Sequence, residues 1–238
     1  MVSLSRRPEG GPVCPRVCEL GRRAARSTSP TRSTTATPAS AAGAGSCDRG
    51  TLADLSARGN ALYRPCAACH GPDGSGNREL GAPAIAGLDS WYVAAQLRKF
   101  KSGARGSHPD DPEGARMRPM AQSLTSEDDV LAVAEHIAQM PPQPAPAVVS
   151  GDEARGRSLW TICAGCHGAS ASGSRASGAP PLDLASDWYL VVQLGKFRRG
   201  VRGAHPDDAT GAVMRTVALG LPDERAMRDV VAYIATLR

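Results

Sequence analysis

Aromatic side chains, long apolar runs and spare cysteines are all scarce in this chain of 238 residues. Phenylalanine occurs only at Phe100 and Phe197, and aromatic residues make up 4% of the sequence. No stretch approaches the length of a transmembrane helix, and residues 1–50 contain no apolar run long enough for a secretory signal. We find no convincing alternation of apolar and polar residues, so strands are not predicted. These absences favour an all-α protein of small units whose cores need additional apolar material.

Only four of the seven cysteines fall after residue 50, since Cys14, Cys18 and Cys47 lie before it. These four form the pattern Cys-x-x-Cys-His twice, in Cys66, Cys69 and His70 and again in Cys163, Cys166 and His167. The pattern is the attachment signature of c-type haem, in which both thiols bond to the haem and the histidine becomes an iron ligand. It predicts two covalently bound haem c groups, which would supply the missing apolar material.

Two other sites use Cys-x-x-Cys, and both fit this sequence less well. A four-cysteine zinc site would have to join two pairs that lie in separate parts of the chain. A thioredoxin-like dithiol needs alternating strands and helices around the motif, and the sequence predicts none.

The second motif belongs to a repeat of a whole domain. An offset of 97 residues separates Cys66 from Cys163, and it continues without a gap through Gly59 and Gly156, then Trp91 and Trp188. Self-similarity at one fixed offset indicates two copies of one folding unit. We therefore predict a low-complexity tail at residues 1–50, one domain at 51–140, a proline-rich, semi-rigid linker at 141–147 and a second domain at 148–238.

Helical periodicity predicts three main helices in each domain. The first covers residues 52–62 or 153–159 and leads into the motif, and the second runs from 90 to 103 or from 187 to 200. The third begins after Ser126 or Pro222, where Ser126 and Asp129 form a capping pattern. Gly59 and Gly156 lie inside the first helices at a cost in stability, so another helix is expected to approach closely there.

The formal net charge of +5 belongs to the tail. Residues 1–50 hold eight Arg and three acidic residues, whereas residues 51–238 hold 20 basic and 20 acidic residues. The basic isoelectric point therefore gives no support to nucleic-acid binding by the folded part. The first domain carries a formal charge of −2 and the second +2, which favours different redox protein partners for each.

The chain resembles the class I cytochromes c, and two such domains in tandem resemble the di-haem cytochromes of the c-four family. The resemblance rests on the haem motif near the start of each domain, the Gly-Ala-Pro loop, the Trp-Tyr helix, a late methionine and a final amphipathic helix. It implies an all-α fold in which each small domain wraps around one covalent haem c. It covers residues 51–238 and leaves the tail unexplained.

The resemblance implies a methionine sulfur as the second iron ligand. In the first domain Met117 and Met120 compete for this role, and only Met117 aligns with another methionine, Met214. The expected iron ligands are therefore His70 with Met117 and His167 with Met214. The resemblance also implies that the carbonyls of Pro83 and Pro180 accept the ring N–H of the proximal histidines.

His108 and His205 are rival ligands, which would give bis-histidine iron. Both lie in His-Pro-Asp-Asp loops rich in turn-forming residues. Their alternative role is a hydrogen bond within a surface loop, and we favour that role.

These features predict a carrier that moves electrons in a respiratory chain by outer-sphere transfer, with partners that are redox proteins. The alternative is an electron-accepting subunit of a dehydrogenase, flavocytochrome or oxidase complex, including peripheral association with a membrane complex. A di-haem peroxidase is disfavoured because two methionine ligands leave no open iron. Haem c is attached outside the cytoplasmic membrane in bacteria, which implies a periplasmic protein. Because no secretory signal is visible, we expect that the given start is not the biological one.

Overall fold

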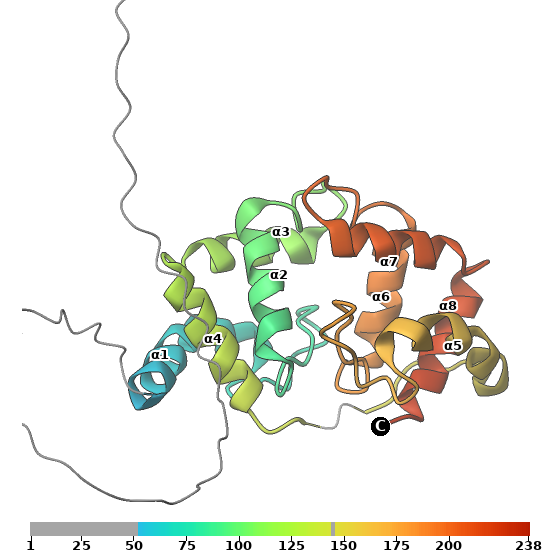
Figure 1. Ribbon diagram of the computed structural model, residues 1–238, viewed down its shortest axis with the longest axis horizontal. Helices are drawn as coiled ribbons and strands as arrows, with labels where there is room; N and C mark the ends of the chain where they lie inside the picture. The colour runs from blue at the N-terminus through green and yellow to red at the C-terminus, as the bar shows by residue number, and fades with distance from the viewer. Residues whose placement is uncertain (1–51, 144–145) are drawn as a thin grey trace, which may run out of the picture. The chain divides into compact units, whose positions relative to one another are not determined.

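The computed structural model describes residues 52–143 and 146–238, with side chains from residue 56 onward. The predicted tail and its three cysteines lie outside the described residues. Asp48–Arg238 forms one compact unit. Eight α-helices occupy its described residues, which contain no sheet, so the predicted all-α class is confirmed (Figure 1). None of these helices is long and apolar enough to cross a membrane.

The described residues of each half of the unit form four helices. Domain 1 denotes the first set, and its helices are α1 (Leu52–His70), α2 (Ser90–Ser102), α3 (Pro112–Gln122) and α4 (Glu127–Gln139). Domain 2 denotes the second set, and its helices are α5 (Glu153–His167), α6 (Asp187–Arg198), α7 (Ala209–Leu219) and α8 (Glu224–Ala235).

The prediction of three main helices per domain was wrong, because α3 and α7 are additional helices. Helix α3 begins at Pro112, a residue suited to the first helical position, and the Asp111 side chain accepts a hydrogen bond from the N–H of Gly114. Its sequence mixes three charged residues with a second proline, so apolar periodicity did not reveal it. The first helices are also longer than predicted and include the whole haem motif, because α1 continues through Pro65.

The helix ends follow local chemistry. The predicted capping box is present at the start of α4, where Ser126 and Asp129 each bond the backbone N–H of the other. Helix α2 ends at the predicted Gly103, which has a left-handed φ of 86°. Helix α8 begins at Glu224, after Pro222 as predicted, and its N-cap is Asp223, whose side chain accepts from the N–H of Ala226.

The first and last helices of each domain cross at a glycine, as predicted. A methyl group at Gly59 would overlap the carbonyl oxygen of Ala132 on α4, and one at Gly156 would overlap that of Asp229 on α8. These crossings bring α1 against α4 and α5 against α8, and both bury apolar side chains of the last helix. The buried residues of α8 include Met227, Val230, Val231 and Ile234.

An aromatic pair beside each crossing differs between the domains. In domain 2 the rings of Trp160 and Tyr233 lie 6.5 Å apart, and in domain 1 Tyr63 faces His136 at 5.3 Å. Burial lowers the pKa of His136 below its ordinary value of 6.5. The unfolded chain therefore binds more protons than the folded one around pH 6, so this histidine costs stability as the pH falls.

We expect His136→Tyr to stabilise domain 1 and to flatten its pH dependence. The tyrosine reproduces the aromatic pair of domain 2, which contributes about 0.5–1.5 kcal/mol. It also removes the pH dependence that His136 causes. The contribution of His136 to stability is fully present above pH 6.5 and is lost as the pH falls through its lowered pKa. Denaturant unfolding of the holoprotein at pH 7 and pH 5 measures both effects, and an unchanged pH dependence would contradict this origin.

Polar side chains join the two domains within the compact unit. Lys99 of α2 lies 2.5 Å from Asp208, and Lys196 of α6 lies 2.6 Å from Asp111. Burial alone would raise the pKa of Asp111, but the bond from Lys196 holds it below its ordinary range. After the linker, the buried carboxylate of Asp187 accepts the N–H groups of Val148 and Val149.

Two candidate haem sites

The final turn of α1 carries the complete haem motif of domain 1. Cys66 and His70 stand one helical turn apart, and Cys69 lies three residues after Cys66, so all three lie near one end of the helix. The His70 side chain is buried, and its Nδ1 lies 2.9 Å from the carbonyl oxygen of Pro83. Because a carbonyl only accepts, Nδ1 donates the proton and Nε2 keeps a free lone pair for a metal.

Domain 2 repeats this arrangement on the final turn of α5. His167 is buried, and its Nδ1 lies 2.9 Å from the carbonyl oxygen of Pro180. Burial lowers the pKa of both His70 and His167, although the bonds to the proline carbonyls oppose it. Each imidazole is thereby held neutral and oriented, which is the form that binds iron.

The loop after each motif is fixed by backbone hydrogen bonds. The N–H of Gly76 donates to the carbonyl of His70 at 2.8 Å, and Asn77 pairs with Ala82 through two such bonds. Gly173 and His167 make the equivalent bond at 2.8 Å in domain 2. These turns bring Pro83 and Pro180 back over the histidines and so position the ring N–H acceptors.

The first cysteine of each pair gives no support to a redox-active dithiol. Burial raises the pKa of the Cys66 thiol, and it raises that of Cys163 to about 11. A thioredoxin-like pair needs a lowered pKa on the attacking thiol. Among the described residues no three His, Cys, Asp or Glu side chains gather to hold a metal ion, so the zinc alternative has no support either.

Met117 lies on α3 and is half-buried against the apolar core of domain 1, which Cys66 and Tyr92 also border. Met214 occupies the equivalent place on α7 and is likewise half-buried. The two helices that sequence analysis missed therefore carry both of the expected methionine ligands. Met120 lies three residues further along α3 and is not among the residues packed on that core.

The rival histidines are used within their own loops. Nδ1 of His108 accepts the N–H of Asp110 at 3.1 Å, and Nδ1 of His205 accepts that of Asp207 at 3.1 Å. This is the loop role that we favoured for them.

Two buried arginines form a feature that the sequence analysis did not identify. Arg105 and Arg202 are each more than nine-tenths buried, and each stacks on one of the two phenylalanines with 4.5 Å to the ring centre. In both, the buried Nε has no hydrogen-bond partner among the described residues. Their shared place in the repeat, 97 residues apart, was the signal available in the sequence.

The residues present fit a haem in each domain. A free histidine Nε2, two cysteines and a half-buried methionine are the groups that would hold the iron and the porphyrin. The unpaired Nε–H groups of Arg105 and Arg202 are donors suited to a carboxylate, and haem c carries two propionates. Buried donors without partners are rare, so these two favour a carboxylate-bearing group nearby.

The model of the cytochrome c family matches this chain twice, at residues 56–141 and 153–238. The chain belongs to the cytochrome c family. A thiosulfate dehydrogenase electron acceptor from Stutzerimonas stutzeri strain A1501 is 36% identical over 170 residues, covering 67% of this chain and 74% of that protein. Cytochrome c4 from Azotobacter vinelandii is 29% identical over 193 residues, covering 76% of this chain and 88% of that protein.

Solved structures agree with the sequence relatives. The reduced recombinant cytochrome c4 from Pseudomonas stutzeri matches with a TM-score of 0.61 and 26% identity, over 75% of this chain and 96% of that one. The protein is thus a cytochrome c4-like electron carrier with two tandem cytochrome c domains and two covalently bound haem c groups, as the sequence predicted.

Proposed function

We propose that this cytochrome works in the periplasm as the electron acceptor of a dehydrogenase that oxidises thiosulfate, with His70 and Met117 as the iron ligands of domain 1 and His167 and Met214 as those of domain 2. The observation that carries the choice of donor is the 36% identity to a thiosulfate dehydrogenase electron acceptor. The ligand assignment rests on the two matching histidine–proline contacts and on the methionines of α3 and α7.

The chain's own residues hold and tune the redox centres. When bound, each haem supplies an iron that gains and loses one electron without binding a substrate. His70 and His167 stay neutral, and their Nδ1–H groups donate to the carbonyl oxygens of Pro83 and Pro180. The sulfurs of Met117 and Met214 would be the second iron ligands and would favour a relatively high potential. This ligand set gives no open iron for peroxide, which disfavours the peroxidase alternative.

A free carrier between several donors and acceptors is the second candidate. It is favoured by the relatives named cytochrome c4 and by the opposite formal charges of the two domains. Under this alternative, different partners would dock at each domain, and the rates with both would depend on salt concentration.

Reduction kinetics test the proposed donor. We expect the oxidised holoprotein to be reduced rapidly by thiosulfate together with a purified thiosulfate dehydrogenase, and only slowly by thiosulfate alone. A single-haem cytochrome c at the same haem concentration is the control for unspecific transfer. If the dehydrogenase reduces both proteins equally slowly while dithionite reduces both haems, the proposed donor is wrong and the free carrier is favoured.

A further inference from the structure

The contacts between domain 1 and domain 2 are reciprocal. Lys99 of domain 1 pairs with Asp208 of domain 2, and the residues 97 positions away, Lys196 and Asp111, pair in the opposite direction. Each acceptor is almost wholly buried, with side-chain exposures of 1% for Asp208 and 3% for Asp111. Lys99 therefore contacts the counterpart of Asp111, and Asp111 contacts the counterpart of Lys99. This is the pattern of an isologous interface.

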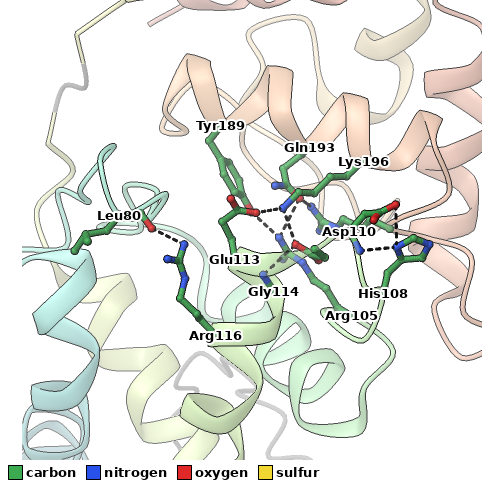
Figure 2. A network of polar contacts seen from close by, with 12 residues as sticks. Leu80, Arg105, His108, Asp110, Glu113, Gly114, Arg116, Tyr189, Gln193 and Lys196 are labelled. Atoms are coloured by element: carbon green, nitrogen blue, oxygen red, sulfur yellow. Dashed lines mark hydrogen bonds and ion pairs between the residues drawn. The ribbon is translucent and has the colours of Figure 1, made fainter.

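A second set of contacts repeats this reciprocity. The side-chain oxygen of Gln96 accepts from Arg105 of its own domain at 2.8 Å and from Arg202 of the other at 3.0 Å. The oxygen of Gln193 accepts from Arg202 at 2.8 Å and from Arg105 at 3.1 Å. Figure 2 shows Gln193 and Lys196 of α6 reaching toward domain 1, where Arg105 lies.

All the partners needed for these contacts exist within each domain by itself. Domain 1 carries a lysine (Lys99), its carboxylate (Asp111), an arginine (Arg105) and its amide (Gln96), and domain 2 carries the same four types at the same offset. Three contacts are not reciprocal among the described residues. Arg105 donates to the hydroxyl of Tyr189 at 2.7 Å, and the N–H of Ala84 donates to the hydroxyl of Ser186 at 3.4 Å, without a counterpart in the other direction. In the third, Lys196 also bonds Glu113 at 2.6 Å whereas Lys99 bonds the hydroxyl of Thr210 at 2.6 Å. Both groups accept from a lysine, so this difference does not exclude either domain from pairing with its own kind.

We infer that the interdomain face is self-complementary. Besides the other domain of its own chain, each domain can then pair through this face with the same domain of another copy of this chain. The opposed charges on the face, lysine against aspartate twice, recur when two copies of one domain meet. In the intact chain the linker keeps domain 2 close to domain 1 at a high effective concentration, so this pairing is dominant. The linker, and not the contacts, selects which domains pair. The inference concerns the face alone and does not depend on the identity of the electron donor.

Cutting the linker of the folded holoprotein tests this inference. A protease site is inserted after Gln143, the full-length holoprotein is cleaved, and native mass spectrometry counts the domain pairs. We expect three pairs after incubation: domain 1 with domain 2, domain 1 with domain 1 and domain 2 with domain 2. The absorption spectrum checks that both cleaved domains keep their folded haem sites. Mixed pairs alone, or separate domains alone with intact spectra, would overturn the inference.

Two matched charge reversals sharpen the test, and both leave the caps of α3 and α7 intact. In Lys99→Glu, a pair of two domain 1 copies faces carboxylates at both Lys99 contacts, whereas a pair of two domain 2 copies is unchanged. Lys196→Glu gives the mirror result. Loss of one partner of a buried ion pair lowers pairing at least about a hundredfold, so each variant is expected to lose one like pair and keep the other. If either reversal removes both like pairs, or neither, the face is not self-complementary.

Discussion

Replacing Met117 with alanine is expected to remove half of the far-red sulfur–iron charge-transfer band of the oxidised holoprotein. The band arises from sulfur-ligated iron, and Met214 would still supply it in domain 2. The potential of one haem is expected to fall by at least about 0.1 V, within the roughly 0.8 V that axial ligands span. Absorption spectra and a redox titration measure both effects.

Met120→Ala is the matched control for this prediction. Met120 lies on the same helix, half-buried like Met117, and has no methionine at the equivalent position of domain 2, where Val217 stands. The variant is expected to keep the full band and both potentials. A loss of the band in Met120→Ala, with Met117→Ala unaffected, would show that the ligand was assigned to the wrong methionine.

Gly156→Ala is expected to destabilise domain 2 by about 1–3 kcal/mol. The new methyl group would overlap the carbonyl oxygen of Asp229 and lie 2.9 Å from the Cβ of Tyr233. Helix α5 would have to move away from α8, which opens a core that contains Val230, Val231 and Ile234. Since α5 also carries Cys163 and His167, the haem site of this domain should loosen with it.

Gly165→Ala separates this steric effect from helix propensity. Gly165 lies on the same helix, and a methyl group there would meet nothing within 4 Å. Alanine is the better helix former by about 1 kcal/mol, so this variant is expected to be neutral or slightly more stable. Chemical denaturation followed at the haem absorption compares the two, and equal destabilisation would contradict the close crossing.

The repeat explains why so much of the site was predictable. Cys66, His70 and their counterparts follow from a motif whose spacing is set by haem chemistry. The choice of Met117 over Met120 rests on the resemblance, which implies a methionine ligand, and on the offset to Met214, and it stays a prediction. The last helices were predictable because one face of each is buried, and a buried face requires apolar residues at helical spacing. Val130, Val133 and Ile137 form this face in domain 1.

Helices α3 and α7 escaped prediction for a physical reason. Few residues of α3 are buried, among them Gly114 and Ala121, and these are too small to create an apolar period. The interdomain contacts were hidden as well. Lys99, Lys196, Arg105 and Arg202 resemble ordinary surface charges in the sequence, and only the fold brings each one to its partner across the interface.

A spectroelectrochemical titration of the holoprotein tests the central claim most directly, namely that each domain holds one haem through a histidine and a methionine. The expected result is two haems per chain, two one-electron transitions at relatively high potential, and a far-red charge-transfer band that accounts for both irons in the oxidised state. A single haem per chain, or two low-potential transitions without that band, would contradict the account.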